Sequence, residues 1–371
     1  MALSSAIQTT LLRYRHEIEA ALRSAIADVA AQAGTHDTDS FYGQIQYHLG
    51  WVDANLTPTQ SDTGKLLRST LVLMAYELAG AWGLANPETT GTEHLRRALP
   101  AAVAVELTHN FTLIHDDIED GDTERRHRPT VWTIWGVPQA LNTGDGLHSL
   151  ARLVLWKVLD QGVDGLTAVR LAHILDRATL ILTEGQHLDL SFEQRSDISV
   201  AMYVDMIRRK TAALMACAAE MGALLGTRDQ ETIHALHDFG NATGIAFQVR
   251  DDLLGVWATS MESGKTPAGD IYRRKKSLPI LHALEHANAR DRQTLMEAYR
   301  QDAPVTARQV EDVLAVMQNT QTKAYCRQFL ATHCQLAYDA LKRVPYQTNP
   351  LTMRAHHDLE TLVRFIEEAA H

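Results

Sequence analysis

The sequence predicts an all-α fold, in which the whole chain forms a single-domain helical bundle. Apolar residues recur at the three- and four-residue spacing of a buried helix face along nearly all of the 371 residues. No stretch alternates β-branched and polar residues in the way that a half-buried strand would. No internal repeat or low-complexity tract divides the chain, so we expect one domain over residues 1–371, with residues 1–63 as an N-terminal helical segment and connector packed on it.

The first half of the chain is expected to hold long helices that are separated by small, polar, Pro or Gly residues. Their apolar periodicity places these helices over 11–29, 66–78, 99–120, 147–159 and 166–188. The breaks between them are expected at 33–40, 55–64 and 86–91 and at Pro138 and Gly144. The third of these helices differs from the others because its long apolar run ends in acidic residues.

The second half of the chain shows the same periodicity. Helices are expected there over 200–225, 231–257, 278–286, 307–316, 322–342 and 352–368. Glycine inside a helix costs about 1 kcal/mol relative to alanine, so Gly244 weakens the prediction that the second of these helices is continuous.

Composition excludes several classes of protein. A formal net charge of -10 argues against nucleic-acid binding, although local basic groups can still bind an anionic substrate. The chain has no apolar run of about 18 residues and no segment of secretory type, so we expect no integral membrane helix. Three cysteines without a CxxC pair indicate a reduced, cytoplasmic protein.

The first candidate site residues are the acidic residues at the end of the helix over 99–120. Asp116 and Asp120 lie one turn apart on one helix face, with Asp117 beside them. Like charges repel, and the helix dipole disfavours acid at this end of a helix. A magnesium ion, which is held by carboxylate and phosphate oxygens, would reverse that repulsion. A solvated acidic helix end is the alternative interpretation.

A second acidic pair, Asp251 and Asp252, lies in an apolar stretch of the helix over 231–257. Buried carboxylates need a partner or a metal ion. Carboxylates on facing helices commonly build the metal sites of helical bundles, so the two acidic clusters predict a magnesium site with two walls. Neutralisation of the pair by Arg250 is the alternative.

Basic groups accompany both acidic clusters on otherwise apolar helices. The residues concerned are Lys65, Arg68, Arg125, Arg126, Lys210, Lys265 and Lys275. Guanidinium groups bind phosphate oxygens in pairs, and lysine supplies a compact charge. Each group alone is typical of a solvated surface, but their recurrence beside acid indicates a diphosphate site.

In the order and spacing of these motifs, from about residue 64 to residue 284, the chain resembles the trans-isoprenyl diphosphate synthase family, and most closely its short-chain farnesyl and geranylgeranyl diphosphate synthases. The DDxxD motif of that family matches Asp116, Asp117 and Asp120, and its second aspartate-rich motif matches Asp251 and Asp252. The resemblance implies a helical bundle around a deep central cavity, with three Mg2+ ions at its mouth. It also implies condensation of isopentenyl diphosphate with dimethylallyl, geranyl or farnesyl diphosphate into an all-trans product.

The resemblance further implies roles for single residues. The metal ligands would be Asp116, Asp120 and Asp251, supported by Asp117 and Asp252. The residues that bind isopentenyl diphosphate would be Lys65, Arg68, His109 and Arg126. The residues that bind the allylic diphosphate would be Arg125, Lys210, Thr211, Gln248, Lys265 and Lys275. Those next to the reacting atoms would be Lys210, Thr211, Gln248 and Lys265, with Gln186 lining the same centre.

Some residues depart from the family pattern. Gly255 stands where many members carry the third aspartate of the second motif, and Leu66 and Ser69 replace a common Arg and Pro. Because the main metal ligand of that motif is present, we expect the change Gly255→Asp to alter activity little.

Product length is expected to depend on two residues below the first acidic cluster. Thr112 lies about one helical turn below Asp116, and Phe111 flanks it. In the family, side-chain bulk at these positions forms the floor of the cavity. One aromatic beside one small residue is similar to a twenty-carbon synthase, which makes geranylgeranyl diphosphate the favoured product; fifteen carbons or a longer chain are the alternatives.

Two other functions share parts of this pattern. A class I terpene cyclase would have the bundle and one aspartate-rich motif, but it needs no counterpart of Lys65 and Arg68. A regulatory subunit of a heteromeric prenyl synthase would usually lack the acidic motifs. The resemblance implies a homodimer, without indicating which face pairs.

Overall fold

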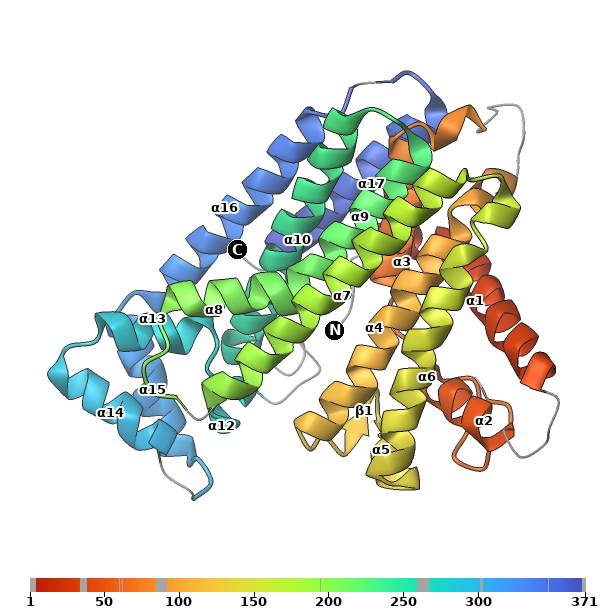
Figure 1. Cartoon of the computed structure of the whole chain (residues 1–371). Helices are drawn as coiled ribbons and strands as arrows, with labels where there is room; N and C mark the ends of the chain where they lie inside the picture. The colour runs from red at the N-terminus through yellow and green to blue at the C-terminus, as the bar shows by residue number, and fades with distance from the viewer. Residues whose placement is uncertain are drawn as a thin grey trace.

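The computed structural model describes residues 5–33, 39–59, 61, 63–84, 92–193, 195–258, 267–300, 303–345 and 347–368, and the prediction of an all-α fold is confirmed (Figure 1). Its α-helices are α1 (Ser5–Ala33), α2 (Asp39–His48), α3 (Leu67–Leu78), α4 (Leu99–Glu119), α5 (Val131–Trp135), α6 (Val137–Trp156), α7 (Gly165–Glu193), α8 (Val200–Ile207), α9 (Ala213–Gly226), α10 (Gln230–Trp257), α12 (Gly269–Tyr272), α13 (Leu278–His286), α14 (Ala289–Arg300), α15 (Ala307–Asn319), α16 (Thr322–Lys342) and α17 (Pro350–Glu367). Shorter elements are the 3-10 helices η2 (Ala81–Gly83), η3 (Glu93–Arg97) and η4 (Leu159–Gln161), the π-helix η5 (Arg208–Ala212) and the strands β1 (Glu124–Arg125) and β2 (Arg128–Pro129).

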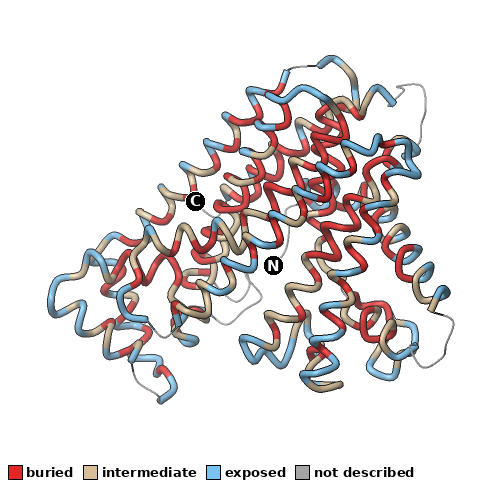
Figure 2. The backbone as a smooth tube through the Cα atoms, in the orientation of Figure 1, coloured by how far each residue is buried: buried red, intermediate tan, exposed pale blue. Residues whose placement is uncertain are grey.

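The core of the bundle is built around α3 and α9, whose side chains are buried on nearly every side. A helix that is apolar all round belongs in an interior, and Figure 2 shows the buried backbone concentrated in these central helices. Helix α9 packs on α3, α7 and α10, and α4 packs between α3 and α6. The helices that carry the two acidic clusters are therefore fixed to one rigid core.

The boundary predicted at Pro138 is confirmed, because α5 ends at Trp135 and α6 begins at Val137. Its extension to Gly144 is wrong, because α6 runs without a break to Trp156. Proline is tolerated in the first helical turn, where its missing N–H has no partner to lose. Position 144 lies inside the helix and is a glycine because a Cβ there would come within 2.3 Å of the Nε2 atom of His115 on α4. What the sequence showed as a helix breaker is thus a point where two helices approach closely.

Helices α2 and α14 and the hairpin of β1 and β2 are among the elements that were not predicted, and each lacks a strong local signal. Helix α2 is short and mostly polar, and α14 buries only Leu295 and Ala298. The hairpin of β1 and β2 turns through Arg126 and His127, whose φ angles are 53° and 59°. Such two-residue turns favour Asn and Gly, so Arg-His gives no sequence signal for a hairpin.

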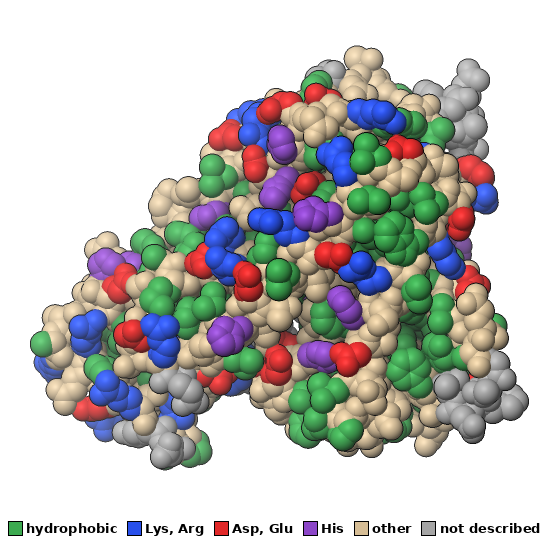
Figure 3. All heavy atoms as spheres, in the orientation of Figure 1, with side chains coloured by type: hydrophobic (Ala, Val, Ile, Leu, Met, Phe, Trp, Pro, Cys, Tyr) green, Lys and Arg blue, Asp and Glu red, His purple; other side chains and the backbone are tan. Residues whose placement is uncertain are grey.

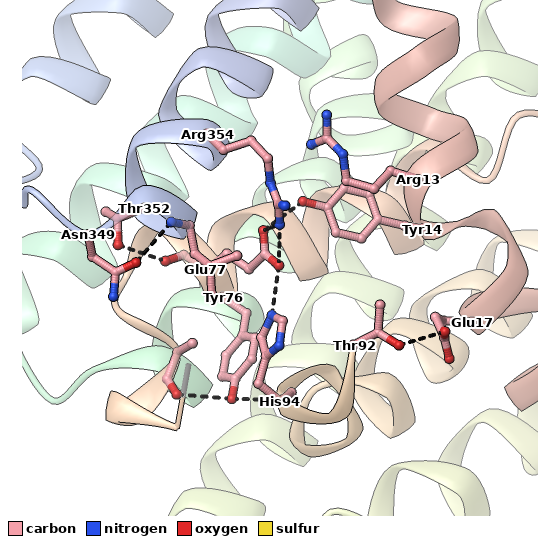
Figure 4. A network of polar contacts seen from close by, with 12 residues as sticks. Arg13, Tyr14, Glu17, Tyr76, Glu77, Thr92, His94, Asn349, Thr352 and Arg354 are labelled. Atoms are coloured by element: carbon pink, nitrogen blue, oxygen red, sulfur yellow. Dashed lines mark hydrogen bonds and ion pairs between the residues drawn. The ribbon is translucent and has the colours of Figure 1, made fainter. Parts of the chain in front are cut away.

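A buried network around Glu77 joins the two ends of the chain (Figure 4). The carboxylate of Glu77 on α3 accepts a hydrogen bond from the hydroxyl of Tyr14 on α1 at 2.8 Å and lies 2.8 Å from Nε2 of His94 on η3. Arg354 on α17 donates to both of its oxygens at 3.0 Å. Burial alone would raise the pKa of Glu77, but these partners hold it below its usual value. The carboxylate therefore stays charged and ties α1, α3 and α17 together.

Within the described ranges, none of the helices combines the length and the apolar character that a bilayer crossing requires.

Candidate active site

The first acidic cluster lies at the C-terminal end of α4, where it meets two basic side chains. Asp116 accepts a hydrogen bond from Nζ of Lys210 at 3.0 Å, and its other oxygen lies 3.5 Å from the guanidinium of Arg125. Asp117 is buried and accepts from Nε of Arg125 at 2.6 Å. The structure thus brings together the acidic residues and two of the basic residues that the sequence singled out.

The carboxylates of this cluster are held at an electrostatic cost. Desolvation raises the pKa of Asp120 to about 7, with a further contribution from the charge of Asp116. Desolvation also raises the pKa of Asp117 to about 6, against the lowering effect of Arg125. Ionising these groups near neutral pH is unfavourable until a cation binds between them, which is the behaviour expected of a metal site.

Lys210 and Thr211 lie in η5, a single wide π turn between α8 and α9. Such turns occur inside α-helices frequently at functional sites. Nζ of Lys210 donates to Asp189 on α7 at 2.6 Å as well as to Asp116. Burial alone would lower the pKa of Lys210, but the carboxylates of Asp189 and Asp116 hold it above its usual value. The lysine is therefore a charged bridge between α4 and α7.

Asp189 was missed by the sequence analysis. The amide of Gln186, three residues earlier on α7, donates to Glu119 at 2.7 Å, so both α7 side chains reach the end of α4. Residues three apart share a helix face, and that spacing was the signal that could have revealed Asp189.

The second acidic cluster is joined to the first through the same π turn. The hydroxyl of Thr211 donates to Oε1 of Gln248 at 3.0 Å, and Nε2 of Gln248 donates to Asp252 at 3.1 Å. The other oxygen of Asp252 accepts from the hydroxyl of Tyr203 on α8 at 2.5 Å. Asp252 is fully buried, and burial raises its pKa to about 6. These contacts suit a positioning role for Asp252, and Tyr203 is a residue that the sequence analysis did not identify.

Asp251 is more exposed than Asp252 and faces basic side chains. Its carboxylate lies 3.8 Å from the guanidinium of Arg250, so the alternative of charge neutralisation by Arg250 has a contact behind it. Burial lowers the pKa of Arg68 on α3, and the nearby carboxylates of Glu106 and Asp251 oppose that shift. The side chain of Asp251 thus lies between Arg250 and the basic group that contains Arg68.

That basic group lies next to the acidic clusters. Arg68 lies 3.1 Å from Nε2 of His109, whose pKa is held well below its usual value by burial and by Arg68 and Arg126. The neutral ring can therefore accept a hydrogen bond from the guanidinium. Arg126, held in the left-handed turn of the hairpin, packs on Gly64, where a Cβ would lie 2.7 Å from its NH2 atom. This contact places Arg126 directly beside Lys65.

Lys275 and Gly255 lie next to the second acidic cluster. Burial alone would lower the pKa of Lys275, but Asp252, 4.0 Å away, and Asp270 hold it above its usual value. Asp270 on α12 is buried and bonded to Arg273 at 2.9 Å. Lys265 lies outside the described residues.

The sequence analysis expected Gly255→Asp to be nearly neutral, but the packing around position 255 leads us to expect a loss of activity instead. A Cβ at position 255 would lie 2.2 Å from Oδ2 of Asp270, so the carboxylate of Asp270 already occupies that space. An added aspartate would displace the carboxylate of Asp270 from its contacts with Arg273 and Lys275 and would place two like charges together. We expect turnover to fall about tenfold or more, since misplacements near 1 Å can cost up to about 100-fold.

Gly269→Ala is the matched control for this prediction, because a Cβ at position 269 meets nothing within 4 Å. Steady-state turnover of the two variants, with the urea midpoint as a folding check, tests the assignment. Unchanged or faster turnover of Gly255→Asp would show that α12 adapts without cost.

A cavity of about 180 Å³ lies beside the first acidic cluster, and Arg68 and His109 also line it. Its lining includes Asp116, Lys210 and Thr211 at one end and Phe111 and Thr112 further along α4. The hydroxyl of Thr112 is turned to its own helix, where it donates to the carbonyl of His109 at 2.7 Å. Charged groups therefore surround one end of the cavity, and the two residues expected to form its floor lie beyond them.

The oxygen-rich donor set fits a hard divalent cation. In the part of the chain that the structure describes, no three His, Cys, Asp or Glu side chains form a ready-made metal site. Magnesium commonly takes one or two carboxylates and completes its shell with waters and substrate phosphates. The family resemblance assigns such an ion to Asp116, Asp120 and Asp251, and this assignment stays a prediction.

Comparison with known proteins gives one consistent family. The sequence model described as Polyprenyl synthetase matches residues 50–317. The (2E,6E)-farnesyl diphosphate synthase of Mycobacterium tuberculosis (strain ATCC 25618 / H37Rv) is 42% identical over 248 residues, which cover 67% of this chain and 64% of that protein. The chain thus aligns with just under two thirds of the length of that relative. The geranylgeranyl diphosphate synthase of the same strain is 39% identical over 271 residues, 73% of each chain.

The fold comparison agrees with the sequence comparison. The crystal structure of a polyprenyl synthetase from Streptomyces coelicolor A3(2) superposes with a TM-score of 0.83 at 32% identity, over 97% of this chain and 99% of that one. The resemblance drawn from the aspartate-rich motifs is therefore confirmed, and the chain belongs to the polyprenyl synthetase family.

Proposed function

We propose that the chain is a magnesium-dependent prenyltransferase that condenses isopentenyl diphosphate with an allylic diphosphate into a short all-trans prenyl diphosphate. One observation carries this proposal: Lys210 of one basic group and Arg68 of the other line the same cavity as Asp116. The relatives named farnesyl and geranylgeranyl diphosphate synthase support the same reaction class.

The allylic diphosphate is assigned to the first acidic cluster. Bound Mg2+, three ions by the family resemblance, would be held by Asp116, Asp120 and Asp251 and would neutralise the leaving diphosphate. Lys210 and Arg125 already contact Asp116, so they lie where they can bind phosphate oxygens once the cations shield the acid. Lys275, and by the family resemblance Lys265, would add charge at the same end.

Isopentenyl diphosphate is assigned to Lys65, Arg68, His109 and Arg126. The neutral ring of His109 accepts from Arg68, which fixes the guanidinium, and the hairpin holds Arg126 beside Lys65. Asp251 is not assigned to phosphate. Its negative charge stabilises the charged form of the Arg68 guanidinium. The guanidinium groups of Arg68 and Arg126 are thus two donors with fixed orientation, which favour a doubly charged ligand that each can bind with two hydrogen bonds.

The reaction itself needs no side-chain nucleophile. After the allylic C–O bond ionises, the double bond of isopentenyl diphosphate attacks the cation, and a proton passes to the released diphosphate. The oxygens of Thr211 and Gln248 lie where they can stabilise the cation, and Leu182 and Leu214 shield it from water.

The favoured product is geranylgeranyl diphosphate. Phe111 provides bulk on the floor, whereas Thr112 is small and its hydroxyl is turned to its own helix. Farnesyl diphosphate is the alternative product, and relatives of both names match the chain.

The decisive test is an assay of the purified chain with isopentenyl diphosphate and allylic primers of five, ten and fifteen carbons. We expect magnesium-dependent release of diphosphate and a twenty-carbon product by chromatography. Hydrocarbon formed from an allylic diphosphate alone would instead identify a terpene cyclase. No product from the chain alone would point to a regulatory subunit.

We also propose that the chain forms a homodimer through the face of α6 and α7. Large apolar side chains are exposed along both helices and the turn between them, and Figure 3 shows hydrophobic atoms on that face. They are Val137, Leu141, Leu153, Trp156, Leu159, Leu166, Val169 and Leu180. Contiguous exposed apolar surface of this kind marks an interface, and a second copy of the chain is the partner that the family resemblance implies.

Leu180→Asp tests this interface. Leu180 is 61% exposed in a single chain, and a charge buried between two copies would lack a partner. We expect the variant to run as a monomer by light scattering, whereas Leu336→Asp, at an exposed leucine on α16, leaves the dimer intact. A monomeric wild-type protein, or a Leu180→Asp dimer, would contradict the proposal.

Two further proposals concern location and domain organisation. All three cysteines are free and buried, which suits a reduced, cytoplasmic location. Residues 1–371 are proposed to act as one domain, since α1 packs on α3, α4 and α17.

A further inference from the structure

The turn that carries Arg126 is unfavourable for its own residues. Arg126 and His127 have φ angles of 53° and 59°, the left-handed conformation that a two-residue hairpin turn of this kind requires. A residue with a Cβ adopts this conformation only at a cost, because its Cβ approaches the following carbonyl oxygen. The strands β1 and β2 are two residues long each, and a hairpin alone is marginally stable at best in water. Contacts from outside the hairpin must therefore hold the turn.

The base of the hairpin is fixed close to the end of α4. The N–H of Thr130 donates to the carbonyl of Thr123 at 3.1 Å, and the hydroxyl of Thr130 donates to the carbonyl of Asp122 at 2.9 Å. These contacts join the outer ends of the two strands. They lie away from the turn, so the φ angles of Arg126 and His127 depend on other contacts.

Arg128, directly after the turn, fastens the hairpin to α2 and to the segment that follows α2. Its Nη1 atom donates to the carbonyl of Tyr47 at 3.0 Å, and its Nη2 atom donates to the carbonyl of Val52 at 2.6 Å. The guanidinium also lies over the ring of Tyr47, 4.0 Å from the ring centroid. The hydroxyl of Tyr47 donates in return to the carbonyl of Pro129 at 2.8 Å. Residues 128–129 are thus cross-linked to two separate pieces of backbone.

Arginine suits this junction better than any other cation. Tyr47 belongs to the last turn of α2, where carbonyl groups lack partners within the helix and a positive charge is favourable. A guanidinium donates from several nitrogens in one rigid plane, so a single side chain can hold the carbonyls of Tyr47 and Val52 at once. Lysine at position 128 would keep the charge, but its flexible ammonium group would not fix both carbonyls in the same orientation.

We propose that Arg128 is a positioning residue for isopentenyl diphosphate, because it holds the turn in the conformation that places Arg126 beside Lys65. The inference rests on the proposed prenyltransferase function, in which Arg126 binds that substrate and Arg128 has no role. The guanidinium of Arg126 packs on Gly64, the residue before Lys65, so the position of the turn decides where this group lies. Without Arg128 the turn relaxes, and Arg126 no longer meets the diphosphate in a fixed orientation.

Arg128→Met tests the proposal, because methionine fills similar space but donates no hydrogen bond. A misplacement near 1 Å costs up to about 100-fold, so we expect the KM for isopentenyl diphosphate to rise about tenfold. The KM for the allylic diphosphate should change much less, because Arg125 is held separately by Asp117 at 2.6 Å. Arg128→Lys should give an intermediate KM for isopentenyl diphosphate. An unchanged KM in Arg128→Met, or an equal rise for both substrates, would overturn the inference.

His127→Gly should rescue the loss, because glycine adopts a positive φ without the steric cost. The side chain of His127 is 97% exposed and lies 3.7 Å from Glu124, so little contact is lost with it. We expect the double variant His127→Gly/Arg128→Met to recover most of the affinity for isopentenyl diphosphate. A general loss of stability or of positive charge would not be corrected by a glycine in the turn. A double variant with the same KM as Arg128→Met would contradict the proposal.

Arg23→Met is the matched control. Arg23 on α1 lies over the ring of Trp51, with 4.2 Å between the guanidinium carbon and the ring centroid. The variant therefore removes an arginine that stacks on the same segment after α2, while the contacts of Arg128 stay in place. Both KM values should remain at the wild-type level. A rise in the KM for isopentenyl diphosphate equal to that of Arg128→Met would show that the effect is not specific to the hairpin.

Limited digestion with trypsin tests the turn without any need for catalysis. Trypsin can cut after Arg125 and Arg126 once the hairpin opens, whereas proline protects the bond after Arg128. Cleavage of a transiently opened segment follows the population of its open form, so we expect Arg128→Met to be cut there at least about fivefold faster than the wild-type chain. His127→Gly/Arg128→Met should be cut more slowly than Arg128→Met. Equal cleavage of the wild-type chain and Arg128→Met would refute the role of Arg128, whereas absence of any prenyl product would count only against the proposed function.

Discussion

Replacing Asp116 with alanine is expected to lower turnover by about three orders of magnitude or more while the protein stays folded. Removing a single group that stabilises transition-state charge costs about 10²- to 10³-fold, and Asp116 has two such roles. It is a proposed metal ligand, and it also positions Lys210 and Arg125. Turnover at saturating magnesium and substrate is the measurement.

Stability should not fall in this variant, because the pKa of Asp120 is raised in part by the neighbouring charge of Asp116. Removing that charge relieves repulsion, so the urea midpoint should be equal or higher. Asp122→Ala removes an exposed carboxylate beyond the same helix and should reduce turnover less than threefold. Near-normal turnover of Asp116→Ala in excess magnesium would refute the ligand assignment.

Glu77→Ala is expected to have the largest effect on stability. Its carboxylate is fully buried and is the shared acceptor for Tyr14, His94 and Arg354, so its loss leaves their donors without a counter-charge. Breaking a buried ionic contact by removing one partner costs about 3–5 kcal/mol. The unfolding midpoint in urea, followed by circular dichroism, measures the loss.

Two variants grade this prediction. Glu77→Gln keeps a hydrogen-bond acceptor and should lose clearly less stability than Glu77→Ala. Glu124→Ala removes an exposed carboxylate of the hairpin and should change the midpoint little. A loss below about 1 kcal/mol for Glu77→Ala would mean that the network in Figure 4 adds little to the packing of α1 and α17 on the core.

The sequence predicted most of the helices because buried faces impose their period on apolar residues. The helices expected over 278–286 and 322–342 begin and end at the predicted residues. Gly244 did not interrupt α10, since close packing on neighbouring helices stabilises a glycine that would be unfavourable in isolation. The boundary predicted at Pro138 coincides with the start of α6, whereas the break predicted at Gly144 failed because a glycine inside a helix can also mark close packing of two helices.

The site was only partly readable from the sequence. Lys210 donates to Asp116, and its neighbour in the chain, Thr211, donates to Gln248; motifs in the sequence pointed to all four residues. Asp270 could not be assigned in the same way, because its role depends on which helices are neighbours, and the only signal for Asp189 was its spacing from Gln186. The π turn is also invisible to a periodicity analysis, since one extra residue in a turn does not disturb the apolar pattern enough to be seen.

The π turn at Arg208–Ala212 changes the direction in which side chains point along the continuous helical segment formed by α8, η5 and α9. Each residue advances an α-helix by about 100°, so the insertion of one residue rotates everything after it relative to everything before it. Because of this rotation, Tyr203 on α8 can point to Asp252 while the small side chains of α9 still pack on α3. A homologue that lost this single residue would lose either the hydrogen bond from Tyr203 to Asp252 or the packing of α9 on α3. Deletions at these five positions should therefore be rarer than substitutions.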